Sequence, residues 1–503
     1  MENLKFKNKG LDPFLRIDSF SNISCNKKVA VLGMGIEGLA MVNFLSGREC
    51  EISILDKLSE DKISERLSAE DKIKFSQIIE NDKIIKIFGD SYLDNLSNFD
   101  LIFRSPGISF FNPKIQEAKK NGTLISSQIK LFFDLCPCKI IGVTGTKGKG
   151  TTATLIYEII SRELEANYSR KNPNDVSIPK VFLAGNIGYP AITLISKLKK
   201  DDFVILELSS FQLMDLEKSP QIAVVVNLLI DHLDYHKDID EYKAAKESII
   251  KFQNSGDIAI LNKRSTFEKS VIDMIKSSIK YFSSSDTGDA VVSDDSVILD
   301  PGNRNVKICD KNSIELFGNH NLENIAAATL VADSFGISES TIKSVVSGFK
   351  GLPHRIEFVS EIDGIKFIND SFATNPEPTM AAIRSFTEDK ILILGGSSKG
   401  SDFSQLAQLI ADSNIKGVVL IGDEALKIEQ ALIVAAYSGK ISKGLSDIDE
   451  IVRSAWTMAS AKHVIILSPA CASFGLFKNY KDRGDKFKAA VLKLQNKVSH
   501  ESS

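Results

Sequence analysis

The feature that most constrains the fold is an apolar run that ends in a glycine-rich turn. Residues 140–152 read Ile-Ile-Gly-Val-Thr-Gly-Thr-Lys-Gly-Lys-Gly-Thr-Thr. The β-branched start predicts a buried strand, and the hydroxyls after the last glycine predict the first turn of a helix. A strand, a glycine turn and a helix in this order belong to an α/β fold with a parallel sheet.

Such a turn suits nucleotide phosphates. Glycines let backbone N–H groups approach phosphate oxygens, and the following helix presents its positive end. A lysine adds charge, and a hydroxyl can reach Mg²⁺. The strict G-x-x-x-x-G-K-[ST] pattern is not met, because Val143 replaces the first glycine and Gly150 follows the lysine. We expect these residues to bind the phosphates of a nucleotide: Gly145, Thr146, Lys147, Gly148, Lys149, Gly150 and Thr151.

Composition excludes several other classes of protein. A net charge of −3 gives no reason to expect a nucleic acid or an acidic membrane as partner. No apolar run reaches the roughly 18 residues of a membrane span, and residues 1–28 lack the core of a signal peptide. The six cysteines are scattered, which favours free thiols. We expect a cytoplasmic monomer.

The 503 residues divide into three parts. Residues 1–135 and 353–503 each alternate apolar strands with helices, which predicts two Rossmann-like domains. Residues 136–352 form the central ATP-binding domain around a mostly parallel sheet. Within it, the polar stretch 261–317 predicts an antiparallel extension.

Polar residues at predicted strand ends suggest further chemistry. Glu207 closes an apolar strand, where a carboxylate is well placed to hold Mg²⁺. His232 follows another predicted strand. A histidine in this position suits three alternative roles: a metal ligand, a proton acceptor or a capping residue. From the local pattern alone, Lys246 is an ordinary lysine on a helix face.

The first part carries a weaker signal, Gly33-Met-Gly35-Ile-Glu-Gly38, with Asp56 about twenty residues further on. This spacing imitates a dinucleotide-binding fingerprint, so a dehydrogenase is one alternative. That alternative leaves the central phosphate loop unexplained. A nucleotide-dependent binding protein without enzymatic activity is another.

Several segments together resemble the Mur ligase family, ATP-dependent enzymes that form amides in peptidoglycan precursor synthesis. The segments are Thr144–Lys149, Gly185–Gly188, Leu206–Leu213, Asp231-His232, Gly351–Arg355, Asn369–Ser371 and Ser468–Phe474. The resemblance covers roughly residues 28–490 and is strongest to members that add D-glutamate to UDP-N-acetylmuramoyl-L-alanine.

The resemblance implies roles for individual residues. ATP phosphorylates a carboxylate, and the amine of D-glutamate then attacks the acyl phosphate. Lys149 serves catalysis, while Glu207 and His232 hold Mg²⁺ together with Lys246, the family's carbamylated lysine. Asn324, Arg355 and Asp370 bind ATP. The residues implied in binding the UDP-linked substrate or D-glutamate are Ile36, Gly107, Asn186, Ser209, Gln212, Thr374, Lys399, Ser473 and Phe474.

Three positions depart from the family pattern. Gly150 stands in place of a serine or threonine, so we expect Thr151 to supply the metal-binding hydroxyl. Phe372 replaces a common lysine, and Leu58 stands where an arginine near the substrate phosphate is frequent. The loop also looks like that of folylpolyglutamate synthase, so this enzyme, or a Mur ligase for another amino acid, is the alternative.

Overall fold

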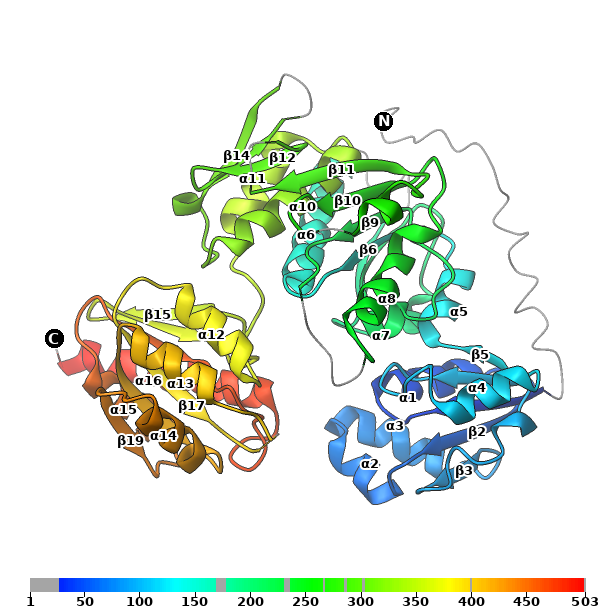
Figure 1. Ribbon diagram of the computed structural model, residues 1–503, viewed down its shortest axis with the longest axis horizontal. Helices are drawn as coiled ribbons and strands as arrows, with labels where there is room; N and C mark the ends of the chain where they lie inside the picture. Colours follow the sequence, from blue (N-terminus) through cyan, green and yellow to red (C-terminus); the bar gives the residue numbers. More distant parts are fainter. Residues whose placement is uncertain are drawn as a thin grey trace. The chain divides into compact units, whose positions relative to one another are not determined.

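The computed structural model describes residues 27–168, 178–229, 236–265, 267–284, 287–300, 304–398 and 400–501. Three separate sheets, each accompanied by helices, make up this part of the chain (Figure 1). The predicted α/β class with three domains is therefore confirmed. Across the described residues, none of the helices is both long and apolar enough to cross a membrane.

The first sheet is parallel throughout and has the order β3-β2-β1-β4-β5. Its strands are β1 (Lys27–Leu32), β2 (Cys50–Asp56), β3 (Ile85–Phe88), β4 (Leu101–Arg104) and β5 (Leu124–Ser126). Its helices are α1 (Ile36–Leu45), α2 (Glu60–Arg66), α3 (Ala69–Ile79) and α4 (Pro113–Lys120). Helix α5 (Gln128–Leu135) leads from this sheet to the central one.

Strand β1 shows why this sheet is covered on both faces. Alternate side chains of a strand point to opposite faces. Val29 and Val31 pack into a core with α1, α2 and α3. Ala30 and Leu32 pack into a second core with α4. An uninterrupted apolar run is therefore the pattern that this position requires.

The central sheet has the order β14-β13-β12-β11-β10-β9-β6-β8-β7. Its first strands are β6 (Lys139–Thr144), β7 (Val181–Gly185), β8 (Phe203–Glu207) and β9 (Ile222–Val225). The others are β10 (Ile258–Asn262), β11 (Ser278–Ser283), β12 (Ala290–Ser293), β13 (Ser296–Leu299) and β14 (Val306–Asp310). Its helices are α6 (Lys149–Tyr168), α7 (Ser210–Leu213), α8 (Ile239–Lys251), α9 (Lys269–Ile272), α10 (His320–Ser334) and α11 (Glu339–Gly348).

The prediction of an antiparallel extension over 261–317 is only partly right. Strands β10, β11 and β12 continue the parallel sheet, and only the β12-β13 and β13-β14 pairs are antiparallel. The buried run Ile258–Asn262 is covered like the strands before it, which is why it joins them in parallel.

The third sheet has the order β15-β16-β20-β17-β18-β19, and only its edge strand β15 runs antiparallel. Its strands are β15 (Glu357–Ile362), β16 (Ile365–Asn369), β17 (Lys390–Gly395), β18 (Ile415–Ile421), β19 (Lys440–Lys443) and β20 (Val464–Leu467). Its helices are α12 (Pro376–Arg384), α13 (Ser404–Asp412), α14 (Ala425–Val434), α15 (Ile448–Met458) and α16 (Tyr480–Glu501).

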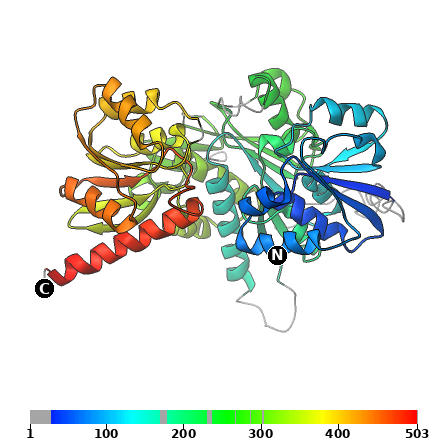
Figure 2. The ribbon, with the colours of Figure 1, turned by 90° about the horizontal axis from the view of Figure 1, so that it is seen from below.

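Helices cover both faces of the third sheet as well. One core combines α12, α13 and α14 with the sheet, and the other combines α15 and α16 with it. Figure 2 shows α16 (red) as a long helix along one side of this sheet.

The chain forms two compact units. The first extends to Asp310 and includes Leu322–Val346, so it holds the first and central sheets. The second combines Lys311–Asn321 with the chain from Ser347 onward and holds the third sheet. The domain boundaries that we expect near residues 135 and 352 stay predictions.

Candidate active site

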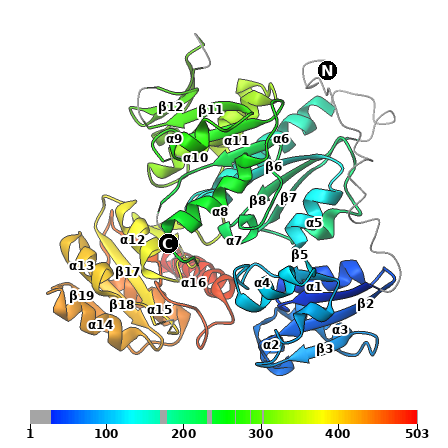
Figure 3. The same ribbon diagram turned by 45° about the vertical axis from the view of Figure 1, so that its right-hand side comes forward.

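The loop between β6 and α6 has the conformation that its glycines permit. Gly145 and Gly148 have φ angles of +156° and +83°, which L side chains rarely adopt. A Cβ atom on Gly148 would lie 2.2 Å from Oδ1 of Asn324, a residue of α10. Figure 3 shows β6 with β8 and β7 in the central sheet. Glycine is thus required both by the turn and by the close approach of α10.

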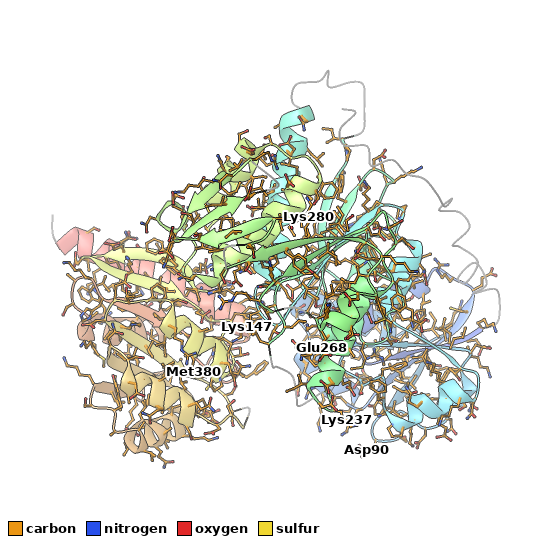
Figure 4. All side chains as sticks on the ribbon, turned by 45° about the horizontal axis from the view of Figure 1, so that its top comes forward. Asp90, Lys147, Lys237, Glu268, Lys280 and Met380 are labelled. Carbon is orange, nitrogen blue, oxygen red and sulfur yellow. The ribbon has the colours of Figure 1, made fainter. Side chains whose placement is uncertain are left out.

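A residue outside the predicted site holds this loop. Asn227 follows β9, and its Oδ1 accepts hydrogen bonds from the backbone N–H groups of Thr146 (3.0 Å) and Lys147 (2.9 Å). Its Nδ2 donates to the carbonyl of Lys147 at 3.0 Å. Lys147, labelled in Figure 4, is exposed. An asparagine at the end of the neighbouring strand is the sequence signal for this role.

The hydroxyls and the lysine of the loop have distinct surroundings. Lys149 Nζ donates to the carbonyls of Gly145 (3.0 Å) and Thr146 (2.9 Å), so the amine lies over the loop. Thr152 is fully buried, and its Oγ1 lies 3.3 Å from Asn324 Oδ1. Thr151 is only half-buried. Of the two hydroxyls, the one on Thr151 is therefore the more accessible to a ligand.

Glu207 is a buried carboxylate beside the loop. It ends β8 and pairs in register with Val143 of β6. Asn186 Nδ2 donates to its Oε1 at 3.0 Å, so these two predicted residues are brought together. Oε2 is buried, and no described residue forms a hydrogen bond to it. A buried oxygen in this state fits a divalent cation, which would replace the missing partner.

The local sequence pattern predicted that Lys246 lies on a solvated helix face. The structure shows instead that Lys246 is buried. Only 1% of the residue is exposed. Its Nζ donates to Thr144 Oγ1 (3.3 Å) and to the carbonyl of Gly145 (3.0 Å), and it lies 4.8 Å from the centre of the Tyr242 ring. Helix α8 therefore brings this amine directly to the start of the phosphate loop.

Of the two histidines between β9 and α8 in the sequence, only His236 is described. His232 lies outside the described residues. His236 is buried, and its Nε2 lies 2.9 Å from Ser210 Oγ, while its Nδ1 lies 3.3 Å from Glu241 Oε1. These contacts link the start of α7 to the first turn of α8, a role that sequence analysis did not predict.

In the first sheet, the side chain of Asp56 accepts hydrogen bonds from backbone N–H groups in the turns after β1 and β2. Its Oδ2 accepts from Met34 N at 2.7 Å and its Oδ1 accepts from Leu58 N at 2.9 Å. The carboxylate therefore braces the glycine turn, which weakens the dinucleotide interpretation. Ile36 and Gly107, two residues implied in substrate binding, are both exposed; Ile36 is the first residue of α1, and Gly107 lies in the turn after β4.

Ser209 and Gln212 form the N-terminal cap of α7. Ser209 Oγ accepts from Gln212 N at 3.3 Å, and Gln212 Oε1 accepts from Ser209 N at 3.0 Å. This reciprocal pattern is a capping box. Gln212 Nε2 then donates to Glu37 Oε1 at 2.7 Å. The side chain of Gln212 is thus fixed at both ends of its amide.

In the third sheet, Asp370 follows β16 and is buried. Its Oδ2 accepts from Ser468 Oγ at 2.7 Å and its Oδ1 from Ile356 N at 3.2 Å. Burial raises the pKa of Asp370 to about 7, although these hydrogen bonds and the charges of Arg355 and Arg483 lower it. The carboxyl group is thus close to its protonation midpoint at neutral pH.

The loop after β20 is held by a buried arginine. Arg483 donates to Ser371 Oγ (3.0 Å) and to the carbonyls of Ser371 (2.9 Å) and Cys471 (3.2 Å). Burial lowers the pKa of Arg483 to about 10. Ser473 in this loop is buried, whereas 62% of Phe474 is exposed. Thr374, two residues before α12, is half-buried, and Lys399 lies outside the described residues.

A glycine-rich phosphate loop, a buried strand-end carboxylate and a buried lysine at one end of a mostly parallel sheet define a nucleotide-binding α/β protein of the phosphate-loop class. Family models match all three sheets. They are described as a Mur ligase MurD-like N-terminal domain (residues 27–127), a Mur ligase middle domain (143–332) and a Mur ligase glutamate ligase domain (354–471). The chain belongs to the Mur ligase family.

Curated relatives extend the similarity over nearly the whole chain. A protein of Acetivibrio thermocellus named UDP-N-acetylmuramoylalanine--D-glutamate ligase is 38% identical over 490 residues, or 95% of this chain and 99% of the relative. A protein of the same name from Clostridium tetani is 36% identical over 95% of this chain and 99% of its own length.

Solved structures share the fold. The UDP-N-acetylmuramate-alanine ligase of Thermotoga maritima has a TM-score of 0.54 at 18% identity, covering 93% of this chain and 99% of that chain. A pseudomurein peptide ligase type C from Methanothermus fervidus has a TM-score of 0.52 at 16% identity, covering 93% of this chain and 100% of that chain. With the family established, the dehydrogenase alternative no longer has support.

Proposed function

We propose that the chain is an ATP-dependent ligase that joins D-glutamate to UDP-N-acetylmuramoyl-L-alanine during peptidoglycan precursor synthesis. The observation that carries this proposal is the 38% identity, over 95% of the chain, to a relative named for that reaction. The geometry is consistent with it, because a phosphate loop, a buried carboxylate and a buried lysine meet at one end of the central sheet.

The reaction would proceed through an acyl phosphate. A carboxylate oxygen of the UDP-linked substrate attacks the terminal phosphorus of ATP, and ADP leaves. The neutral amine of D-glutamate attacks the acyl carbon, and the intermediate expels phosphate and loses one amine proton to leave an amide. Charge develops on the transferred phosphoryl group, so loop N–H groups and a cation contribute more than covalent help. Lys149 is the loop residue that we assign to this charge.

Mg²⁺ would neutralise part of the charge on the ATP phosphates. We assign Glu207 to it because of its buried oxygen without a hydrogen-bond partner, and Thr151 because of its accessible hydroxyl. We assign Lys246 as a carbamate, which would turn a buried amine into a carboxylate-like ligand. His232 completes the proposed set. Asn186 positions Glu207 through their 3.0 Å hydrogen bond.

Other residues are assigned to the organic ligands. Asn324, Arg355 and Asp370 would bind ATP. Ile36, Gly107, Ser209 and Gln212, with Asn186, would bind the UDP-linked substrate. Ser473, Phe474, Thr374 and Lys399 would bind D-glutamate, whose side-chain carboxylate needs hydrogen-bond donors and a cation. A cytoplasmic location and a monomeric state also stay predictions.

The test is phosphate release from ATP by the purified chain with UDP-N-acetylmuramoyl-L-alanine and one amino acid at a time. We expect D-glutamate to be preferred over L-glutamate, L-alanine, L-lysine and meso-diaminopimelate. L-alanine and L-lysine, which lack the side-chain carboxylate, should be rejected by several powers of ten. Lys149→Ala should abolish activity, and the exposed Lys200→Ala should not. Preference for another of these amino acids would refute the specificity, and absence of turnover with all of them would refute the ligase proposal.

A further inference from the structure

Two cysteines lie side by side where the chain passes from the first sheet to the central one. Cys136 directly follows α5, and Cys138 directly precedes β6. Their Sγ atoms are 3.6 Å apart, within hydrogen-bond distance for sulfur, and both are free thiols. The Sγ of Cys136 also lies 3.6 Å from the carbonyl oxygen of Cys138. The two side chains therefore form a pair of thiols in direct contact.

The backbone holds this pair from both sides. Cys136 is the C-cap of α5, with φ −65° and ψ 120°, and its N–H donates to the carbonyl of Phe132 at 2.8 Å. The ring of Pro137 restricts its own φ angle to about −65°. Cys138 is only 8% exposed and belongs to the apolar core of the central sheet. Helix α5 and this core thus keep the two sulfur atoms close to each other.

The two thiols differ in accessibility and in acidity. Cys136 is half-buried beside the exposed Pro137, so a small solute can reach it, whereas Cys138 is buried. The hydrogen bond with the Cys138 thiol lowers the pKa of Cys136, while the same contact and burial raise the pKa of Cys138. An accessible thiol with more thiolate character reacts first with an oxidant, and a second thiol beside it can complete a disulfide.

We propose that Cys136 and Cys138 are a redox modification site: hydrogen peroxide oxidises the half-buried Cys136, and Cys138 then closes a reversible disulfide with it. An exposed disulfide is of the labile kind that thiol reductants reopen. Transient disulfides of this kind also occur in reducing compartments, where structural disulfides are rare. The inference does not depend on the proposed ligase reaction, because neither cysteine is assigned to the nucleotide or to a substrate.

The oxidation takes place in two steps. The Cys136 thiolate attacks one oxygen of hydrogen peroxide, the O–O bond breaks, and the departing hydroxide takes up the proton that the thiol released, which leaves a sulfenic acid on Cys136. The Cys138 sulfur then attacks the Cys136 sulfur. The S–S bond forms, the S–O bond breaks, and hydroxide leaves as water with the proton of Cys138. Two thiols thus give two electrons to one peroxide and yield one disulfide and two waters.

The test uses the full-length reduced protein, freed of reductant and treated with one equivalent of hydrogen peroxide. N-ethylmaleimide then caps the remaining thiols, and trypsin releases residues 131–139, which contain both cysteines. We expect mass spectrometry to find this peptide uncapped and lighter by two hydrogens, and dithiothreitol before capping should restore two caps. Residues 49–57 of the same digest are the control. They contain Cys50, which should stay capped because burial raises its pKa.

Variants establish the order of the two steps. Cys138→Ser should stop at the sulfenic acid of Cys136, which dimedone traps, whereas Cys136→Ser should give neither the disulfide nor a dimedone adduct. Cys50→Ser should behave as wild type.

The wild-type digest decides the proposal even where a variant fails to fold. A wild-type peptide 131–139 that keeps two capped thiols, or a disulfide from either cysteine to another residue, would overturn the proposal. A dimedone adduct on Cys138 of the Cys136→Ser variant would overturn the assigned order. These outcomes are read from peptide masses and not from amide formation, so the proposed function is tested separately.

Discussion

Lys246 Nζ donates a 3.0 Å hydrogen bond to the backbone carbonyl of Gly145, the first glycine of the phosphate loop. The lysine comes from the middle of α8, and only 1% of it is exposed. A buried amine is costly unless it is paired or serves a function. This contact places a titratable nitrogen where the nucleotide phosphates are expected, and it motivates the first prediction.

Lys246→Ala should be nearly inactive, because the proposed carbamate would lose both of its oxygens. Acetate, which can place a carboxylate in the vacated space, should restore part of the activity. The measurement is turnover with increasing acetate, compared with chloride at the same ionic strength. Lys251→Ala, at an exposed lysine of the same helix, is the control. Full activity of Lys246→Ala would show that Lys246 has a structural role and no part in catalysis.

The two hydroxyls at the start of α6 should respond differently to removal. Thr152 is fully buried against Asn324, whereas Thr151 is half-buried. Thr151→Val should therefore raise the Mg²⁺ concentration needed for half-maximal activity, by about tenfold. Thr152→Val should lower the thermal stability and leave the Mg²⁺ requirement unchanged. The assignment is wrong if only Thr152→Val changes the Mg²⁺ requirement.

The phosphate loop could be predicted from sequence because its constraints are local. The positive φ angles of Gly145 and Gly148 require glycine, and the buried run before them requires a covered strand. The contacts of Asn227 and Glu37 could not be predicted in the same way, because each depends on a partner 80 or 175 residues away. Pairing of β6 with β9 brings Asn227 beside the loop, whereas the contact of Glu37 with Gln212 joins helices that belong to two different sheets.

Errors of the sequence analysis have the same origin. Lys246 looked like a solvated lysine because helical spacing does not reveal what covers a face. The edge strands β15 and β19 were not predicted, because their sequences, EFVSEI and KISK, lack a continuous apolar run. Strand β11 falls in the stretch that we predicted as an antiparallel extension, because the sequence of a single strand does not encode the direction of its pairing.

Asp370 should make the stability of the protein depend on pH. Burial raises its pKa from 3.8 to about 7, so the folded protein binds this proton more tightly than the unfolded chain. The folded state therefore loses stability as the pH rises from about 4 to 7. Asp370→Asn cannot ionise, so its free energy of unfolding should rise relative to wild type over this range, on the order of 2 to 4 kcal/mol.

Urea unfolding at several pH values measures this difference. The substitution also alters the hydrogen bonds to Ser468 and Ile356, but that effect does not depend on pH, so the slope is the quantity to compare. Asp363→Asn, at an exposed turn between β15 and β16, is the control and should show the wild-type slope. Parallel curves for wild type and Asp370→Asn would contradict a raised pKa.

Phe372 stands at the position where a lysine is common in the family. The ring of Phe372 packs against the guanidinium group of Arg355. The guanidinium carbon of Arg355 lies 3.8 Å from the centre of the Phe372 ring, and the ring of Tyr480 meets Phe372 edge-on at 5.0 Å. Among the described residues, none accepts a hydrogen bond from the guanidinium group of Arg355. A ring face holds a cation without using its N–H groups. All of these donors thus stay available to an anionic ligand such as ATP.

Phe372→Ala should raise the KM for ATP about two- to fivefold, because a cation–π contact at a partly exposed site contributes about 0.5–1 kcal/mol. Phe372→Lys should fold, since 37% of Phe372 is exposed, and should keep its activity because the lysine supplies a second cation. Arg355→Ala should then cost less in the Phe372→Lys background than in the wild type. Phe358→Ala, at an exposed phenylalanine of β15, is the control. Equal costs of Arg355→Ala in both backgrounds would show that residue 372 does not share the phosphate charge, and an unfolded Phe372→Lys would show that the ring is part of the core.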